Sequence, residues 1–305
     1  MIQDRFHFEF SYQEAFKRNL GFVSKSEQLT LGNKRIALPG LGGVGGHHLH
    51  SFLRLGMQKF NLSDFDQFEL ANFNRQKGAT MDSLGRPKVD VLSKMAMAIN
   101  PLSEIRKFPD GITEANMGEF LEGVDLVVDT LDLYAMPLKL KLFSRAHRLG
   151  IPVVTAGPLG MGTAVMAFDP DGMSFAEYFD IGDDLPLEEM IAKFLIGLAP
   201  NLYFLKSLVK QSFVNVSEKD LPSLELGCSA AAAALGPLAM RILLQRQVIP
   251  WAPRGFQVDF YSWKSRSFHY PKGNRSLVQK ARYAIAKRVF GNMIKGTSWK
   301  GEPLP

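Results

Sequence analysis

Short apolar runs and longer segments with helical spacing alternate along the first half of this chain. Five runs have the length and composition of strands buried on both faces of a sheet: residues 36–38, 59–63, 105–108, 125–129 and 151–156. Segments with apolar residues at helical spacing separate them, at residues 47–55, 87–99, 114–121 and 138–149. Because strands alternate with helices, the pattern predicts an α/β fold: a doubly wound, mostly parallel, Rossmann-like sheet with helices on both faces.

The second half of the chain has a less regular pattern. It predicts strands at residues 161–168 and 255–261, and helices at residues 191–213 and 228–245. We divide the chain into an N-terminal helical segment at residues 1–30, a central domain at residues 31–260 with a looser crossover region at residues 174–223, and a basic C-terminal tail at residues 261–305. Both a single sheet interrupted by this crossover region and two separate domains are consistent with the pattern.

A glycine-rich loop joins the first predicted strand to the first helix. It reads Gly40-Leu41-Gly42-Gly43-Val44-Gly45. Glycines let the backbone approach a phosphate closely, and the free N–H groups at a helix start attract its negative charge. Asp64 follows the loop by about twenty residues, at the end of the next strand, where a carboxylate can bind a ribose hydroxyl. The chain is therefore predicted to bind a nucleotide.

Three charged segments follow that a dehydrogenase does not need. They are Asn72-Phe73-Asn74-Arg75-Gln76, Gly85-Arg86-Pro87-Lys88 and Asp129-Thr130-Leu131-Asp132. Arginine and lysine can stabilise phosphate oxygens, and an aspartate at the carboxyl end of a strand can hold Mg²⁺. A phosphoryl or nucleotidyl transferase requires such groups, because charge on the phosphates must be offset as a bond to phosphorus breaks.

The order of these motifs resembles the ThiF/MoeB-type adenylyltransferases, relatives of the ubiquitin-activating enzymes. The matching motifs are GxGGVG at 40–45, D-x-D at 64–66, N-x-x-R-Q at 72–76, G-x-x-K at 85–88, N-P at 100–101 and D-x-x-D at 129–132. The resemblance implies that residues 31–260 form an adenylation domain in which ATP reacts with a carboxylate, giving an acyl-adenylate and pyrophosphate. The carboxylate would be the C-terminus of a ubiquitin-like protein, a peptide or a small molecule.

The same resemblance implies a role for each motif residue. The nucleotide would be bound by Gly40, Gly42, Gly43, Gly45, Asp64, Asp66, Gln76 and Lys88. Catalysis would depend on Arg75, Lys88, Asn72 and Arg18. Asp132 would hold Mg²⁺, so ATP and Mg²⁺ are the expected cofactors. Arg18 resembles the arginine that reaches the ATP of the partner subunit in family dimers, which implies a homodimer with a ubiquitin-like or sulfur-carrier protein as candidate substrate.

Two other functions fit part of the pattern. An NAD(P)-binding oxidoreductase shares the glycine loop and Asp64, but it gives Arg75 and Lys88 no joint purpose. A catalytically inactive nucleotide-binding dimeric scaffold of the same fold is favoured by Leu133 and Pro137, because the family usually has an asparagine and an arginine at or near these positions.

The cysteine and histidine content and the hydropathy pattern indicate the expected compartment and argue against a histidine metal site or a membrane segment. Cys228 is the one cysteine, so no internal disulfide forms and a reducing cytoplasm is the expected compartment. His47, His48 and His50 place at most two rings on one helix face, which favours structural roles over metal binding. No transmembrane or export segment is expected from the hydropathy pattern.

The positive charge is concentrated at the C-terminal end. Residues 260–305 carry +9 and the rest of the chain −3, which together give the formal +6. Residues 276–290 predict a basic amphipathic helix, which either contacts an anionic membrane or is docked on the protein. No nucleic-acid recognition motif accompanies these charges, so no nucleic acid is expected as a partner.

Overall fold

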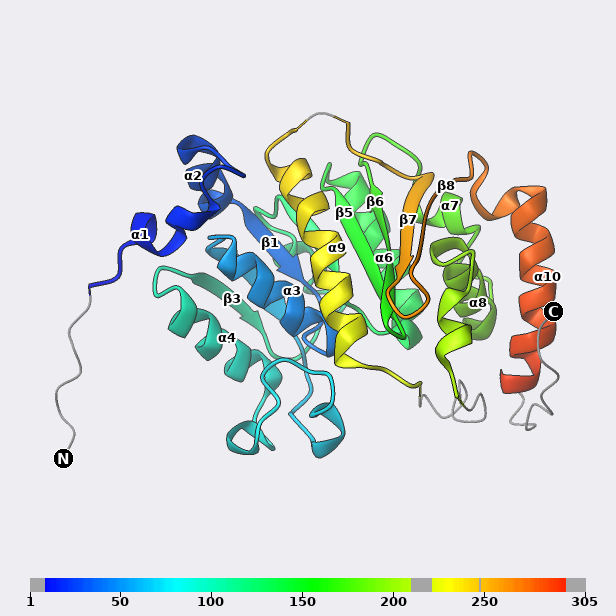
Figure 1. Cartoon of the computed structure of the whole chain (residues 1–305), viewed down its shortest axis with the longest axis horizontal. Helices are drawn as coiled ribbons and strands as arrows, with labels where there is room; N and C mark the ends of the chain where they lie inside the picture. The colour runs from blue at the N-terminus through cyan, green and yellow to red at the C-terminus, as the bar shows by residue number, and fades with distance from the viewer. Residues whose placement is uncertain (1–8, 210–220, 247, 295–305) are drawn as a thin grey trace.

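One eight-stranded sheet runs through the part of the chain that the computed structural model describes, residues 9–209, 221–246 and 248–294 (Figure 1). The strand order is β3-β2-β1-β4-β5-β6-β7-β8. The strands are β1 (Arg35–Leu38), β2 (Lys59–Ser63), β3 (Glu104–Phe108), β4 (Leu126–Asp129), β5 (Val153–Leu159), β6 (Gly162–Phe168), β7 (Arg254–Asp259) and β8 (Lys264–His269). The first five in this order are parallel, and β6, β7 and β8 extend the sheet antiparallel.

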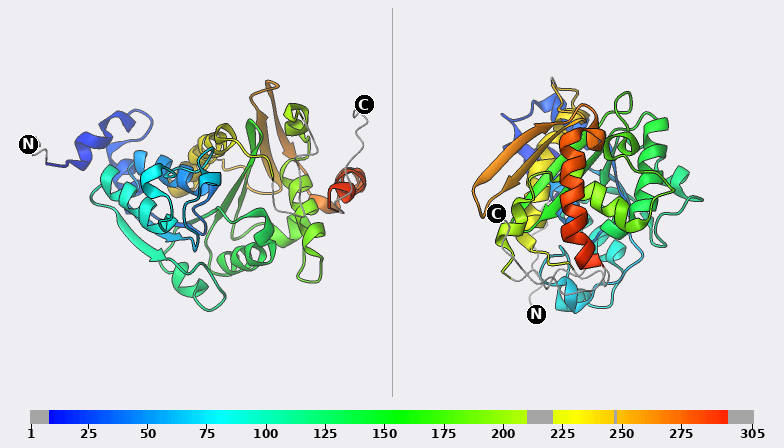
Figure 2. Two further views of the ribbon diagram at one scale, coloured as in Figure 1. Left: turned by 90° about the horizontal axis from the view of Figure 1, so that it is seen from below. Right: turned by 90° about the vertical axis from the view of Figure 1, so that its right-hand side faces the viewer.

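Helices cover both faces of the sheet, as Figures 1 and 2 show. They are α1 (Tyr12–Phe16), α2 (Lys25–Asn33), α3 (Gly43–Arg54), α4 (Lys88–Ile99), α5 (Met117–Phe120), α6 (Met136–Arg148), α7 (Phe175–Phe179), α8 (Leu187–Leu198), α9 (Glu225–Leu243) and α10 (Leu277–Ile294). Helices α3, α4 and α9 contribute to one hydrophobic core, and α6, α7 and α8 to the other. The predicted doubly wound α/β fold is confirmed.

The central strands send alternate side chains into these two cores. In β1, Ile36 and Leu38 pack beneath α3 and α9, whereas Ala37 lies on the side of α6. All four residues of β1 and of β4 are buried, which is the physical reason for their continuous apolar runs. Strand β1 pairs with β2 on one side and β4 on the other, so the chain reverses its direction of winding at this point. Ligands of open α/β sheets bind at such a position.

Two predicted helices differ from the observed ones by four residues or more at an end. Helix α3 begins at Gly43 rather than at residue 47, because the second half of the glycine loop is itself the first turn of the helix. Helix α8 ends at Leu198, whereas the predicted helix continued to residue 213, of which residues 210–213 lie outside the described part. Ala199 precedes Pro200 and has extended-type φ of −125°, as expected for a residue before proline.

Helix α9 has the length and composition of a membrane-spanning helix, the one such case among the described residues. It packs instead against α3, β5 and β6, and most of its apolar window is buried inside the protein. Small residues such as Ala231 and Ala239 allow this close packing in the middle of the molecule.

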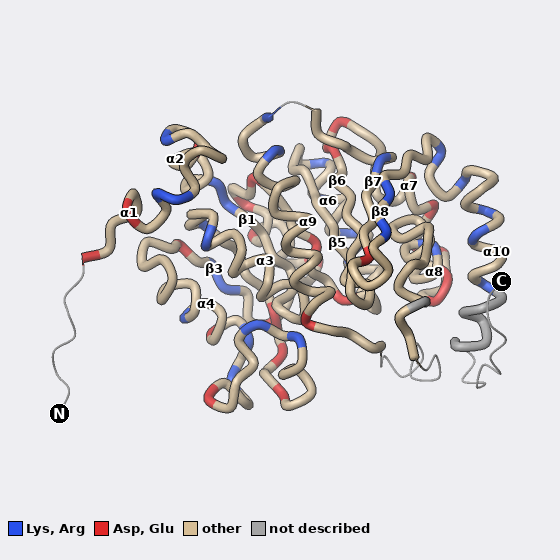
Figure 3. The backbone as a smooth tube through the Cα atoms, viewed as in Figure 1, with Lys and Arg blue, Asp and Glu red and all other residues tan. Residues whose placement is uncertain are grey.

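The segment assigned to a basic tail begins with β8 and continues into α10, which lies beside α8 at one end of the molecule (Figure 2). Asn274 donates from Nδ2 to the carbonyl oxygens of Phe179 and Lys193, both at 2.8 Å. Gln279 donates to the Ile196 carbonyl at 3.1 Å. Lysines and arginines recur along β8 and α10 (Figure 3). Because of the hydrogen bonds of Asn274 and Gln279, the start of this basic helix is docked on the protein, which was one of the two predicted alternatives.

Replacing Asn274 by alanine tests this anchoring. The Asn274→Ala variant removes the hydrogen bonds from Nδ2 to the Phe179 and Lys193 carbonyls, the first of which is buried, so we expect the free energy of unfolding to fall by about 1–3 kcal/mol. Urea denaturation followed by circular dichroism measures it. The control is Ser267→Ala on the exposed side of β8. Equal stability of the two variants would show that α10 is not held through Asn274.

Candidate functional site

The glycine loop closes tightly at the carboxyl ends of β1 and β4. The Gly40 N–H donates to Thr130 Oγ1 at 2.9 Å, which ties the loop to the end of β4. A Cβ atom on Gly45 would lie 2.0 Å from the Gly40 carbonyl oxygen, so no other residue fits there. At Gly42, by contrast, no described atom lies within 4 Å of a Cβ position. The loop is therefore closed toward the protein and open toward a ligand.

Asp64 at the end of β2 stands beside this loop. Its Oδ2 accepts the Leu41 N–H at 2.7 Å, and its Oδ1 accepts the Asp66 N–H at 2.8 Å. Burial raises the pKa of Asp64, and the positive charge of Lys88 opposes this rise. An ionised carboxylate can accept about four hydrogen bonds. Two acceptor positions thus remain for a ligand, and the binding of a ribose by Asp64 stays a prediction.

Lys88, the first residue of α4, brings a buried positive charge to the same place. Its side chain is 5% exposed, and Nζ lies 2.9 Å from Asp66 Oδ2. The Lys88 N–H also donates to the Asp66 carbonyl at 3.0 Å. Asp66 and Lys88, both predicted to bind the nucleotide, therefore form an ion pair that fixes the position of the Lys88 ammonium group.

Arg75 lies on the other side of the loop. Its Nη1 donates to the carbonyl of Ala71 at 2.8 Å and to Asn74 Oδ1 at 2.9 Å. Its charge reaches Cys228, whose sulfur lies 3.3 Å from a Cβ position on Gly43. Burial raises the pKa of Cys228 to about 11, so this thiol stays protonated and packs as a small hydrophobe, as expected. The segment that carries Arg75 packs against the first turn of α3, where a Cβ atom on Gly46 would lie 2.9 Å from the Cβ atom of Lys77.

Asn72 and Gln76 have different roles around Arg75. Asn72 is buried; its Oδ1 accepts the Glu69 N–H at 3.1 Å, and its carbonyl accepts the Gln76 N–H at 2.8 Å. Asn72 therefore shapes the turn that presents Arg75. The side-chain oxygen of Gln76 is buried and has no partner among the described residues. The predicted contact between Gln76 and a nucleotide stays a prediction.

A buried ion pair at the end of β4 was not predicted from the sequence. Asp129 and Lys139 are 1% and 4% exposed, and Lys139 Nζ lies 2.9 Å from Asp129 Oδ2. Thr155 donates to the same oxygen at 2.8 Å, and the ammonium group lies 4.6 Å from the centre of the Phe194 ring. One sequence feature could have indicated the pair: Lys139 lies among the apolar residues on the buried face of α6, where a charged side chain is stable only if it is paired.

This pair decides between the two aspartates as Mg²⁺ ligands. Asp129 is occupied by Lys139, whereas Asp132 is exposed and accepts a hydrogen bond from the Tyr134 N–H at 2.8 Å. The described residues contain no group of three His, Cys, Asp or Glu that could hold a metal ion. One carboxylate fits Mg²⁺ in a nucleotide site, because this ion takes its remaining ligands from phosphates and water.

Two of the three neighbouring histidines, His47 and His48, are buried on α3 and have different surroundings. His48 is fully buried, stacks on Phe52 and has no hydrogen-bond partner among the described residues; burial lowers its pKa to about 3. Nε2 of His47 lies 3.1 Å from the Arg75 carbonyl oxygen. His47 is thus a site residue that the sequence did not reveal, because only the fold brings it to Arg75.

Arg18 lies at the far end of α3 from the glycine loop. The neighbouring Tyr12 donates to the Gly56 carbonyl at 2.7 Å, just beyond the last turn of α3. Twelve residues of helix, about 18 Å, separate this end from the loop. Within one chain, Arg18 is therefore remote from the site, and the prediction that it acts on a partner subunit's nucleotide stands as a prediction.

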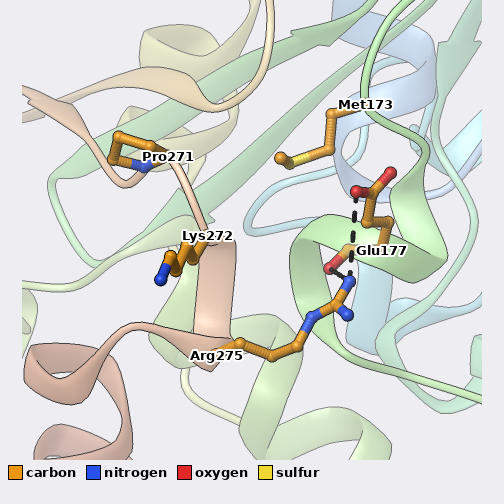
Figure 4. A pocket seen from close by; sticks show the side chains of 5 residues that line it. All are labelled: Met173, Glu177, Pro271, Lys272 and Arg275. Atoms are coloured by element: carbon orange, nitrogen blue, oxygen red, sulfur yellow. Dashed lines mark hydrogen bonds and ion pairs between the residues drawn. The ribbon is translucent and has the colours of Figure 1, made fainter.

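A separate pocket of about 220 Å³ is lined by Met173, Glu177, Pro271, Lys272 and Arg275 (Figure 4). Met173 follows β6, which is antiparallel to β5, so this pocket lies at the opposite edge of the sheet from the glycine loop. The guanidinium of Arg275 points toward Glu177, at 4.0 Å. None of the predicted site residues lines it.

Comparison with known proteins identifies a family with this arrangement. The model of the ThiF family matches residues 16–277. The chain is 31% identical over 142 residues to the tRNA threonylcarbamoyladenosine dehydratase of Bacillus subtilis, covering 46% of this chain and 55% of that protein. It is 31% identical over 132 residues to the sulfur carrier protein adenylyltransferase of Thermus thermophilus, covering 43% and 48%. The chain thus matches about half the length of these curated relatives.

Solved structures share the fold at low sequence identity. A crystal structure of PaaA has a TM-score of 0.65 and 18% identity, over 87% of this chain and 85% of that one. Escherichia coli MccB with ATP has a TM-score of 0.59 and 16% identity, over 83% and 69%. These similarities establish the fold.

The buried ion pair gives a stability prediction. In the Lys139→Met variant, Asp129 loses the only cation paired with it among the described residues and stays buried with hydrogen bonds alone, so we expect a loss of about 3–5 kcal/mol in the free energy of unfolding. The double variant Asp129→Asn/Lys139→Met should recover much of this loss.

Chemical denaturation measures both variants, with Lys141→Met as the control. Lys141 is on the same helix and 44% exposed in its pair with Glu114, so its loss should change stability by about 1 kcal/mol or less. A Lys139→Met variant as stable as this control would contradict the role of the pair.

Proposed function

We propose, from the premise that this chain belongs to the ThiF family, that it is an ATP-dependent adenylyltransferase that activates a carboxylate as an acyl-adenylate and releases pyrophosphate. The observation that carries the proposal is that Asp64 binds the glycine loop, with Lys88 beside it, while the Arg75 segment packs against the first turns of α3. A triphosphate needs cationic side chains beside its phosphates, and a redox dinucleotide has no comparable need for both.

The site residues divide the work in a simple way. The N–H groups at the start of α3 receive phosphate oxygens, since those of Gly40 and Leu41 are bound by Thr130 and Asp64, and Asp64 also binds the ribose. Lys88 and Arg75 stabilise the charge that develops as the bond between the α- and β-phosphates breaks. Mg²⁺, held by Asp132, would supply further neutralisation of the phosphates when bound. Catalysis then depends mostly on positioning and charge stabilisation.

Nucleotide preference separates this proposal from an oxidoreductase. Calorimetry with ATP, AMP and NAD compares the candidate ligands directly. We expect ATP to bind, with a contribution from Lys88 that is lost in Lys88→Ala. Preferential binding of NAD would replace the adenylyltransferase by the redox function.

Pyrophosphate exchange separates an active enzyme from an inactive scaffold. Leu133 begins a short 3₁₀ helix, and Pro137 lies in the first turn of α6, where proline is tolerated. Neither position disturbs the backbone around the glycine loop. Exchange should be assayed with sulfur-carrier proteins ending in glycine, with peptides, with small carboxylic acids and with bulk tRNA. The tRNA arm is included because several relatives are named as tRNA dehydratases.

Removing either positive charge should abolish most of the activity. We expect Arg75→Ala and Lys88→Ala to reduce ATP–pyrophosphate exchange by about 10²–10³-fold, the effect of losing one group that stabilises transition-state charge. Lys94→Ala, on the exposed face of α4, and Arg54→Ala, at the end of α3, are matched controls. Full exchange in both folded variants at 75 and 88 would refute their roles.

Mixing two inactive variants tests the proposed homodimer. Arg18→Ala and Lys88→Ala should each be inactive, because in each homodimer both sites lack one group. In a random mixture, half of the dimers contain both kinds of subunit, and each of these has one complete site. We therefore expect about one quarter of the wild-type exchange activity to return. A mixture as inactive as its parts would exclude a shared site.

A further inference from the structure

His47 connects three segments that meet beside the glycine loop. On α3, its side chain is 5% exposed, with Nε2 at 3.1 Å from the carbonyl oxygen of Arg75. Nδ1 lies 3.4 Å from Ser229 Oγ and 4.0 Å from Glu225 Oε1, both on the first turns of α9. A second link is parallel to it, since Asn74 Nδ2 donates to the Ser223 carbonyl at 2.9 Å. The Arg75 segment is thus tied to α9 from two points.

The hydrogen atoms in this cluster can be assigned from the partners. A carbonyl oxygen only accepts, so Nε2 of His47 carries a hydrogen toward Arg75. The single hydroxyl hydrogen of Ser229 goes to Glu225, whose Oε1 lies 2.6 Å away. In the neutral imidazole, Nδ1 and the Ser229 oxygen would therefore present lone pairs to each other. A second proton on His47 turns this repulsion into a hydrogen bond and places the imidazolium beside the Glu225 carboxylate.

We infer that His47 is a positioning residue for Arg75, and that its second proton fastens the Arg75 segment to the start of α9. The effect of His47 on the reaction rate rests on the proposed function, whereas its contact with the Arg75 segment does not. Ser229 is not an activated nucleophile in this arrangement, because its hydrogen is directed to Glu225 rather than to His47.

The charged groups around His47 set the pH range in which this happens. Burial lowers the pKa of His47, the Arg75 carbonyl raises it, Lys77 lowers it and Glu225 raises it; the overall result is a pKa below the usual value of 6.5. His50, three residues along α3, is coupled to His47 by repulsion. Protonation therefore occurs on the acidic side of neutrality, and the Arg75 segment is fastened more firmly there.

Two substitutions separate positioning from simple folding. His47→Gln keeps an N–H that can reach the Arg75 carbonyl but does not titrate, and His47→Ala removes the contact. We expect His47→Gln to retain exchange near neutral pH and His47→Ala to lose it. As the pH falls below 6.5, the kcat of the wild type relative to His47→Gln should rise by about 2- to 12-fold, the range corresponding to one hydrogen bond. A constant ratio would overturn the switch.

A double-mutant cycle tests whether His47 acts through Arg75. In an Arg75→Ala background, His47→Gln should cause no further pH-dependent change in kcat, because the positioned guanidinium is absent. The same pH-dependent change in both backgrounds would contradict the assignment of His47 as a positioning residue for Arg75.

Nuclear magnetic resonance gives a readout that does not depend on activity. The imidazole nitrogen shifts of His47 and the Nε–H signal of Arg75 should change with one shared midpoint, and Glu225→Gln should move that midpoint to lower pH. Glu122→Gln, an exposed acid far from α9, is the control. If wild-type protein shows no exchange with any carboxylate, the proposed function fails while these titrations still decide the inference. Arg75 signals indifferent to His47→Gln at every pH would overturn it.

Discussion

The whole site depends on the contact between the Gly40 carbonyl and the backbone of Gly45. A side chain at 45 would come within 2.0 Å of that oxygen, so the loop can turn this sharply only without one. The turn lets α3 begin at Gly43, directly after the loop, with its first N–H groups at the end of β1. Thr130 fixes the other side through the Gly40 N–H. The positions of Asp64, Lys88 and the Arg75 segment are then fixed relative to this tight turn between β1 and α3.

The sequence predicted the fold well because its signals were local and repeated. Continuous apolar runs such as Ile36–Leu38 occur in strands buried on both faces, and they need no long-range information. The limits of α8 were less predictable, since apolar spacing continues past Leu198 and only Pro200 marks the end. Strand β8 was missed because five of its six residues are exposed and carry little hydrophobic pattern. Its pairing with β7 is long-range information that composition does not contain.

The candidate site was predictable where residues follow each other in motifs. Asp64, Lys88 and Arg75 belong to short patterns, and the structure brings Asp64 and Lys88 to the loop and the Arg75 segment to the first turns of α3. Lys139 and His47 belong to no motif. Lys139 pairs with Asp129 of another element, and His47 contacts the backbone carbonyl of Arg75, which side-chain motifs do not describe. A single sequence shows such pairs only as a charged or polar residue on an otherwise apolar stripe. Their identity as partners requires the fold.

The pairing of Lys88 with Asp66 has a consequence for the thermodynamics of ligand entry. The ammonium group is buried before any phosphate arrives, and its desolvation is already compensated by a half-exposed carboxylate. A phosphate approaching Lys88 therefore takes part in an anion exchange, in which Asp66 returns to water as the new anion is bound. Such an exchange leaves the number of buried charges nearly constant. The affinity should accordingly depend less on ionic strength than the count of positive side chains at the site would suggest.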